Sequence, residues 1–375
     1  MKRRIRVLHV IDSLDLGGAQ SVLINLVKYG DRSRFEFEVA TMHGRGVYWD
    51  SVLALGIKVR SLSFDSRVPL FVPALLWLYL TRRYDIVHAH LIGANAIAKP
   101  LAALCGVRVR INHDHCNDKE GGPSRWVAVV DKLHNRYSTH VIAVSDSTRA
   151  YAIDKEGLEP GRVTTIHNGI DLDIYRTGAL PRDAARARWN LPQDAFVVAG
   201  IGRLSFQKNF SLFLDAAAAV LKRHPEAYFV IAGTGAEEAQ LKARADRLDI
   251  RSRLRFLGYV ANMTELYPAV DMLMLTSRYE GLPITVLEAM ATGIVIVSSR
   301  LDGVQEVLVD GVDGALVTPG NAAEFSSAVC DLIEQPGKAQ RYRAAALAKV
   351  QAGYSAQAMS RAVDAIYNRY LPQEA

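Results

Sequence analysis

The feature that most constrains this chain is a regular alternation of short apolar runs with segments of helical spacing, which occurs twice along its 375 residues. Apolar runs such as 5–12 and 84–90 are typical of buried strands, whereas 18–30 carries apolar residues at the spacing of one helix face. Strands that alternate with helices predict βαβ units and a parallel, doubly wound α/β sheet. Because the series restarts at 195–205, we expect two Rossmann-like sheets.

Two domains are also expected from length, since one core usually stops growing below 375 residues. We place an N-terminal, acceptor-binding domain at 1–170 and a polar, turn-rich linker at 171–194. A C-terminal, nucleotide-sugar-binding domain follows at 195–355, and a helix at 356–375 can cross back to the first domain. Ligands of such sheets bind at the carboxyl ends of the strands, so we expect the domains to face each other across a cleft.

Composition narrows the class of protein. Half of the residues are hydrophobic, which excludes a disordered chain. The longest apolar stretch, 68–80, contains two prolines and is too short to span a bilayer, and the basic start is not a signal peptide. The three cysteines lack metal or disulfide spacing, which fits a reducing cytoplasm.

The net charge is +6, with basic residues concentrated in the N-terminal half, where Arg67, Arg82 and Arg83 flank the apolar stretch. This pattern fits a solvated basic face, and peripheral contact with an anionic membrane is the alternative. No nucleic-acid motif accompanies it, so we expect no nucleic-acid partner.

Several motifs in the first half follow strands. Gly17 and Gly18 separate a strand from a helix, so a ligand could approach the helix amides there; a tight turn is the alternative. Histidine pairs at the ends of two strands project from one face each: His88 with His90, and His113 with His115. At least one is expected in the active site. A zinc site needs four convergent ligands, which neither this spacing nor the nearby Cys116 establishes, so we expect no metal.

In the second half, Arg203 and Lys208 follow a glycine-rich strand end and suit a diphosphate. Gly233 and Gly235 either cradle phosphate or form a plain turn, and the Asp-Leu-Asp at 171–173 is rejected as a metal motif.

The stretch SRYEGLPITVLEAMATG at 277–293 holds Glu280 and Glu288 on either side of Pro283, which suits the first turn of a helix. Carboxylates accept hydrogen bonds from vicinal hydroxyls, so this arrangement fits a sugar, a diphosphate and a ribose; two exposed glutamates are the alternative. Three amides at this helix start lack intrahelical partners and are expected to bind an anion: those of Ile284, Thr285 and Val286.

With these motifs the chain resembles the retaining glycosyltransferases of the GT-B architecture, family 4. The matching pieces include, in order, GGAQS, HAH, INHD, GRLSFQKN and the 277–293 stretch. The resemblance implies transfer of a hexose or N-acetylhexosamine from a UDP- or GDP-sugar, with retained anomeric configuration and without a metal or other cofactor. One departure is 301–307, where the family more often has a double glycine before its glutamate; Gly303 and Glu306 receive no role.

The resemblance also implies roles for individual residues. His113 would contact the transferred sugar, with His115 as the alternative, and together with Glu280 it would be catalytic. Glu280 and Gly281 would bind the sugar and Glu288 the ribose, while Tyr259 would pack on the base. The diphosphate would contact Gly18, Arg203, Lys208, Leu282, Pro283, Ile284 and Thr285. The acceptor side would include Gly17, Gly18, His90 and His115.

The expected acceptor is lipid-linked or a saccharide of a cell-envelope polysaccharide pathway, at the inner face of the cytoplasmic membrane. Two other functions on the same scaffold stay open: a nucleotide-sugar epimerase or phosphorylase, and a non-catalytic nucleotide-sugar binding protein. No carboxylate nucleophile is evident on the other face of the sugar, so a double displacement is not indicated.

Overall fold

The computed structural model describes residues 3–63, 71–115, 132–178 and 180–371. The chain forms two compact units: unit 1 comprises 1–169 and 356–375, and unit 2 comprises 170–355. Cys116 and Arg67 lie outside the described residues. None of the helices in the described ranges has the length and apolar character needed to cross a membrane.

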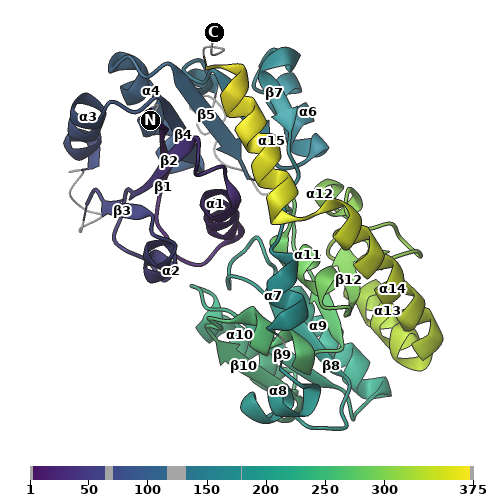
Figure 1. The fold of residues 1–375 in the computed structure, drawn as a ribbon. Helices are drawn as coiled ribbons and strands as arrows, with labels where there is room; N and C mark the ends of the chain where they lie inside the picture. Colours follow the sequence, from purple (N-terminus) through teal and green to yellow (C-terminus); the bar gives the residue numbers. More distant parts are fainter. Residues whose placement is uncertain (1–2, 64–70, 116–131, 179, 372–375) are drawn as a thin grey trace. The chain divides into compact units, whose positions relative to one another are not determined.

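Unit 1 contains a parallel sheet with helices against its faces (Figure 1). The strands lie in the order β3-β2-β1-β4-β5-β6-β7. Their bounds are β1 (Ile5–Ile11), β2 (Phe35–Thr41), β3 (Lys58–Ser61), β4 (Ile86–His90), β5 (Val109–Asp114), β6 (His140–Ala143) and β7 (Val163–Thr165). The helices are α1 (Gly18–Tyr29), α2 (Trp49–Ala54), α3 (Phe71–Arg82), α4 (Ile92–Leu104), α6 (Asp146–Asp154), the 3-10 turn η1 (Pro160–Arg162) and α15 (Ala356–Arg369).

The C-terminal helix α15 packs beside α1 and so completes unit 1 (Figure 1). Its spacing places one apolar face inward, where Val363 and Tyr367 are each 1% exposed. The turn after α1 is also bound to α15, because the Asp31 amide donates to Asp364 Oδ2 over 2.9 Å. Sequence positions more than 300 apart therefore share one core.

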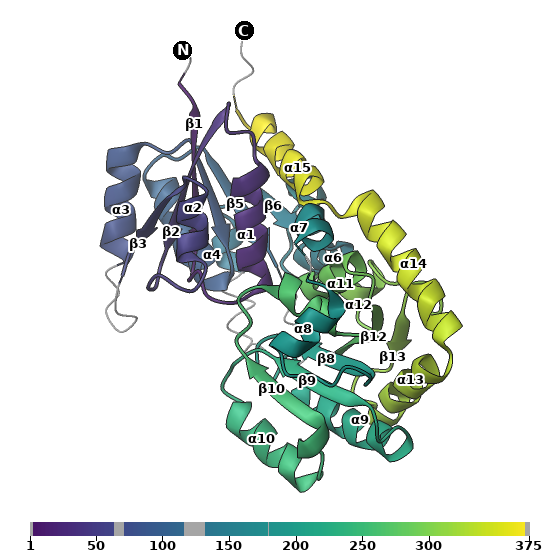
Figure 2. The same cartoon turned by 60° about the horizontal axis from the view of Figure 1, so that its bottom comes forward.

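Unit 2 repeats the architecture around a second parallel sheet, ordered β10-β9-β8-β11-β12-β13 (Figure 2). The strands are β8 (Val197–Ile201), β9 (Tyr228–Ala232), β10 (Leu254–Gly258), β11 (Met272–Leu275), β12 (Val295–Ser299) and β13 (Ala315–Val317). The α-helices are α7 (Leu172–Thr177), α8 (Arg182–Arg188), α9 (Phe210–Arg223), α10 (Glu238–Arg247), α11 (Ile284–Ala291), α12 (Asp302–Gln305), α13 (Ala322–Glu334) and α14 (Pro336–Gly353). Three 3-10 turns complete the unit: η2 (Arg251–Arg253), η3 (Met263–Glu265) and η4 (Tyr267–Ala269). The prediction of two doubly wound α/β sheets is confirmed.

Residues 171–194, for which the sequence suggested a linker, contain α7 and α8 and pack within unit 2. Arg186 of α8 is fully buried, and its Nη2 donates to Asp271 Oδ2 over 2.8 Å. A buried guanidinium needs such a partner, so this ion pair fixes α8 to the start of β11. Asp171 caps α7 by accepting the Asp173 amide, a structural role for part of the Asp-Leu-Asp motif.

Candidate active site

The centre of the candidate site is an ion pair between a half-buried lysine and a buried glutamate, in the loops that follow β8 and β11. Lys208 Nζ lies 2.5 Å from Glu280 Oε1, and Ser277 Oγ donates to the same oxygen over 2.6 Å. Since β8 and β11 are neighbours in a parallel sheet, their following loops meet at its carboxyl edge. Glu280 is only 9% exposed, so Lys208 supplies the charge that its burial requires.

Further bonds hold these two loops together. Gln207 Nε2 donates to the Tyr279 carbonyl over 3.1 Å, and the Arg278 amide donates to the Gln207 carbonyl over 2.8 Å. Thr276 Oγ1 donates to the Lys208 carbonyl over 3.1 Å. These bonds between the two loops hold Lys208 and Glu280 close together. Arg203 lies on an exposed part of the loop after β8.

Two close backbone contacts near the site require glycine, at Gly303 and at Gly233. A Cβ on Gly303 of α12 would lie 1.6 Å from the Gly281 carbonyl oxygen, so α12 can pack on the 280–281 loop only through glycine. A Cβ on Gly233 would lie 1.9 Å from the Gly202 carbonyl oxygen. The second contact favours loop packing over phosphate binding for Gly233.

The start of α11 differs in one respect from the sequence expectation. Pro283 precedes the helix, which begins at Ile284. The Val286 amide donates to the Pro283 carbonyl over 3.1 Å, so our expectation that it lacks a partner was wrong. The amides of Ile284 and Thr285 remain the candidate anion donors. Thr285 Oγ1 is buried and has no hydrogen-bond partner among the described residues, which adds a polar group to this helix start.

Glu288, in the second turn of α11, is held by two tyrosine hydroxyls. Tyr175 of α7 donates to Oε1 over 2.7 Å, and Tyr267 of η4 donates to Oε2 over 2.8 Å. Burial raises the pKa of Glu288 above its usual value, although both tyrosine bonds oppose the rise. Each carboxylate oxygen keeps a lone pair for a further hydroxyl. Tyr259 is half-buried just beyond β10, and desolvation raises the pKa of its hydroxyl.

The predicted residues of unit 1 lie at the carboxyl edge of its own sheet. Gly17 and Gly18 stand at the start of α1, while His90 ends β4 and pairs with His113, one residue before the end of the adjacent strand β5. His90 Nδ1 lies 3.1 Å from His115 Nε2. Burial lowers the pKa of His113 well below its usual value and that of His115 to about 3, so both rings are neutral at pH 7.

Sequence reasoning missed Asp12, which directly follows β1. Its Oδ1 accepts the Ala94 amide over 2.6 Å at the start of α4, and burial raises the pKa of the carboxyl group. A Cβ on Gly93 would lie 2.6 Å from the same oxygen. An acidic residue immediately after a buried strand was the available signal.

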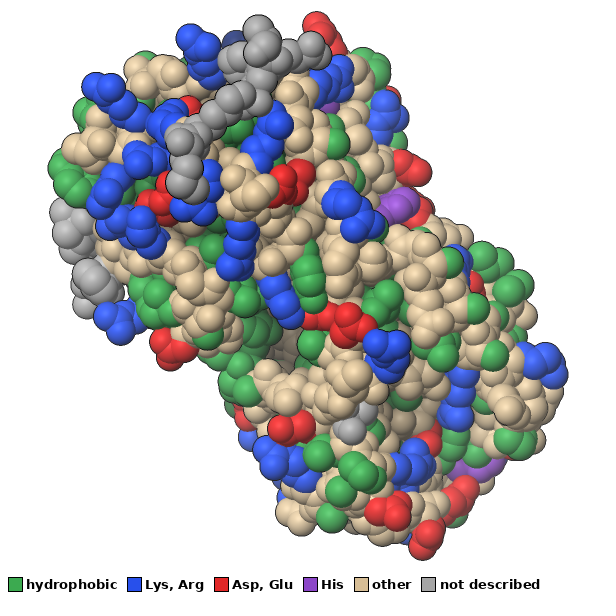
Figure 3. Space-filling view, in the orientation of Figure 1, with side chains coloured by type: hydrophobic (Ala, Val, Ile, Leu, Met, Phe, Trp, Pro, Cys, Tyr) green, Lys and Arg blue, Asp and Glu red, His purple; other side chains and the backbone are tan. Residues whose placement is uncertain are grey.

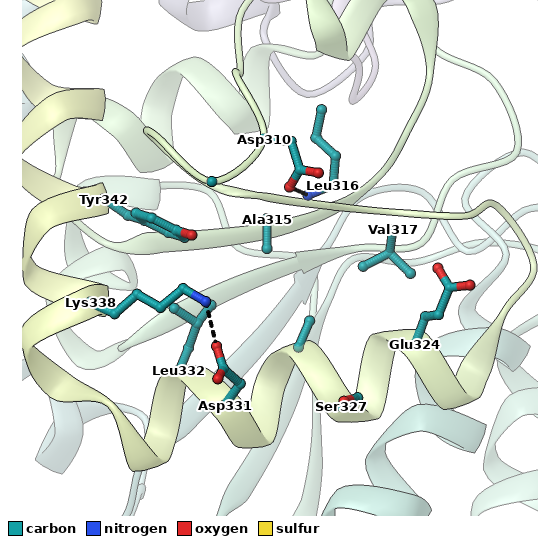
Figure 4. Close-up of a pocket in the computed structure, with 12 residues that line it drawn as sticks. Asp310, Ala315, Leu316, Val317, Glu324, Ser327, Asp331, Leu332, Lys338 and Tyr342 are labelled. Atoms are coloured by element: carbon teal, nitrogen blue, oxygen red, sulfur yellow. Dashed lines mark hydrogen bonds and ion pairs between the residues drawn. The ribbon is translucent and has the colours of Figure 1, made fainter.

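A cavity of about 490 Å³ lies elsewhere in unit 2, beside β13 and between α13 and α14 (Figure 4). Asp310, Glu324 and Asp331 line it, and Lys338 lies 2.8 Å from Asp331. None of the predicted site residues lines this cavity.

Two doubly wound parallel sheets, each with polar residues at its carboxyl edge, are the architecture of the GT-B class of proteins. Two sequence-family models match the chain. The one described as Glycosyltransferase Family 4 matches residues 16–174, and the one described as Glycosyl transferases group 1 matches residues 181–349. The chain thus belongs to the glycosyltransferases of the GT-B fold, family 4, and it is an enzyme of that kind.

Two relatives with glycosyltransferase names and one solved structure with the same fold are similar to this chain. The putative glycosyltransferase EpsF of Bacillus subtilis is 26% identical over 97% of this chain and 96% of its own. An Escherichia coli UDP-Gal:α-D-GlcNAc-diphosphoundecaprenol α-1,3-galactosyltransferase is 27% identical over 66% of each chain. Anabaena HepE, solved in complex with UDP-glucose, has a TM-score of 0.87 at 22% identity, covering 98% of this chain and 100% of that chain.

Proposed function

We propose that this glycosyltransferase moves a hexose or N-acetylhexosamine from a UDP- or GDP-sugar to a lipid-linked or saccharide acceptor, with retention and without a metal. The observation that carries the proposal is the Lys208–Glu280 pair, 2.5 Å apart, in the loops between β8 and α9 and between β11 and α11. A cation, a carboxylate and helix amides at one sheet edge match the phosphates and hydroxyls of a nucleotide-sugar.

In the proposed reaction, donor C1 gains oxocarbenium character as the diphosphate leaves. Lys208 and Arg203, together with the amides of Ile284 and Thr285, stabilise the leaving group electrostatically. A preorganised donor of this kind is typically worth about 10²–10³ in rate. Glu280 binds sugar hydroxyls, and the neutral His113 accepts a hydrogen bond from the sugar or contacts its developing charge.

Glu288 and Tyr259 would hold the nucleoside. Since both oxygens of Glu288 already accept a tyrosine hydroxyl, the carboxylate is oriented before the ribose binds. The UDP-glucose complex of HepE supports a uridine donor, and the name of the E. coli relative supports a diphosphoundecaprenol-linked acceptor.

A lipid-linked acceptor would require contact with a membrane, and α3 offers a suitable surface. Trp77 and Leu80 are 56% and 61% exposed on this helix, beside Arg82 in its last turn. Lysine and arginine side chains gather on the visible face of unit 1 (Figure 3). We expect sedimentation with anionic but not zwitterionic vesicles at low salt, lost in Trp77→Ala/Leu80→Ser. Equal sedimentation with both vesicle types would contradict this surface.

A thermal-shift panel of nucleotide-sugars tests the donor, because a ligand at about 100 times its Kd adds about 2.7 kcal/mol of stability. The preferred donor should then transfer its sugar, and NMR of the product should show the donor's anomeric configuration. A donor-only incubation that epimerises the sugar would identify an epimerase instead. Binding without transfer to any diphosphoundecaprenol or saccharide acceptor would favour the non-catalytic alternative.

A further inference from the structure

Unit 1 contains an array of five histidines, of which the proposed transfer uses only His113. Four come from three adjacent strands, His9 of β1, His88 and His90 of β4 and His113 of β5, and His115 directly follows β5. Four are fully buried and His115 is half-buried. The His113 and His115 rings stack with centroids 4.4 Å apart and planes 11° apart.

Three of these rings converge. One ring nitrogen from each of His90, His113 and His115 lies within 4.8 Å of the others. The His90 Nδ1 and His115 Nε2 atoms are 3.1 Å apart, whereas two imidazoles on one tetrahedral Zn²⁺, bound at 2.0–2.1 Å, have nitrogens about 3.3 Å apart. His113 Nε2 is buried and has no hydrogen-bond partner among the described residues, which is costly unless something binds there.

The outer nitrogens of the two buried ligands each face a partner that can accept their N–H. His90 Nε2 lies 3.0 Å from His9 Nδ1, and His113 Nδ1 lies 3.1 Å from His88 Nε2. His88 Nδ1 in turn lies 2.6 Å from the hydroxyl of Tyr367 on α15. Metal-binding histidines characteristically donate their second N–H to such a partner, which orients the lone pair at the metal.

We propose that His90, His113 and His115 bind one first-row transition metal ion, such as Zn²⁺, through three imidazole nitrogens at the carboxyl edge of the unit 1 sheet. The half-buried His115 gives the site a route to solvent and leaves a fourth position for water. Imidazole favours Zn²⁺, Ni²⁺ or Cu²⁺ over Mg²⁺. The proposal departs from our sequence expectation of no metal, because strand pairing, not spacing, produces the convergence. Because His113 Nδ1 faces His88, a metal-bound His113 has no nitrogen left for the sugar, so the ion and the sugar contact proposed for His113 exclude each other.

The test uses the full chain, stripped with a chelator and titrated with Co²⁺ and Zn²⁺ without any donor, so its result does not depend on sugar transfer. We expect one equivalent per chain, the visible d–d bands of tetrahedral Co²⁺, and three imidazole nitrogens in the zinc X-ray absorption spectrum. The absence of saturable binding, or fewer than three imidazole ligands, would overturn the site.

Variants locate the ion. His115→Gln should weaken binding at least ten-fold, and His9→Phe, which removes the partner of His90, about 10–100-fold. His224→Gln is the control, because His224 lies in unit 2 and bonds Glu334; it should bind as the wild type does. Unchanged metal affinity in both His115→Gln and His9→Phe would refute the assignment. If a variant fails to fold, the X-ray absorption spectrum of the wild type decides whether three imidazoles bind the ion.

Discussion

Lys208 and Glu280 are expected to act as one unit, because the ammonium group lies 2.5 Å from a nearly buried carboxylate. Lys208→Ala should lower kcat/KM about 10²–10³-fold, and Glu280→Gln by a similar factor. The effects of substitutions within one hydrogen-bonded network do not add, so the double variant should lose scarcely more activity than either single variant. The half-buried pair Lys242–Glu238, 2.6 Å apart on α10 and outside the site, gives the control cycle, with near-wild-type rates throughout. Multiplicative losses at Lys208 and Glu280 would show independent roles.

Tyr267→Phe should damage both stability and donor binding. The lost hydroxyl leaves one oxygen of Glu288 without its donor, which costs about 1–3 kcal/mol for a buried charged group. Denaturant titration measures this loss, and titration with UDP or GDP should show about ten-fold weaker binding. Tyr342→Phe, another buried tyrosine of unit 2, should change the nucleotide affinity little. Weaker nucleotide binding in both variants would argue against a specific role for Glu288.

Short sequence motifs could predict which side chains of the candidate site bind the ligand, but not which distant residues hold those side chains in place. Lys208 and Glu280 each stand in a short motif whose residue types indicate phosphate and hydroxyl binding. The hydroxyls that hold Glu288 come from residues 113 and 21 positions away, so no local pattern identifies them. The convergence of the histidines likewise depends on the pairing of β4 with β5.

At the scale of elements, α12 depends on one glycine. Gly303→Ala would place a methyl group 1.6 Å from the Gly281 carbonyl oxygen, so helix and loop must separate. We expect a loss of about 1–3 kcal/mol in the free energy of unfolding, together with weaker nucleotide binding. Gly337→Ala in α14 is the matched control, because nothing lies within 4 Å of its added Cβ. A neutral effect at Gly303 would show that α12 can shift freely.

The fixation of the α1–β2 turn to α15 predicts a pH effect. Burial raises the pKa of Asp364 from 3.8 to about 6, so its contribution to stability is present below pH 4 and is lost as the pH rises through 6. Asp364→Asn can still accept the Asp31 amide without carrying the charge. It should therefore be more stable than the wild type at pH 7.5, by about 1 kcal/mol after allowance for solvent screening, and equal to it near pH 4. Parallel stability curves between pH 4 and 7.5 would contradict this.

The alternation of strands and helices predicted most elements because buried strands and amphipathic helices have distinct periods. It did not predict β13, whose three residues are too few to show a period, nor the short α7 and α8, whose polar sequence suggested a linker. The helices α12, α13 and α14 were not predicted either. Strand order was also out of reach, since pairing depends on contacts between distant segments.

At the scale of the whole molecule, the chain crosses between units before it ends. Unit 1 is built from 1–169 and needs α15, which is synthesised only after all of unit 2. Four apolar side chains of α15 are at most 8% exposed: Met359, Val363, Ile366 and Tyr367. Burying each contributes about 1.5–3 kcal/mol as an upper estimate, so together they rival the 5–15 kcal/mol that stabilises a typical domain.

Truncation after Ser355 should consequently unfold unit 1 while unit 2 stays folded. Hydrogen exchange measured by mass spectrometry gives a separate readout for each sheet: amides of β1 and β4 should lose protection, whereas those of β8 and β11 should keep it. Truncation after Leu371 retains all of α15 and is the control. Because His88 bonds Tyr367, a chain without α15 should also lose the ordered histidine array. Full protection of β1 and β4 in the shorter chain would mean that residues 1–169 fold without the helix.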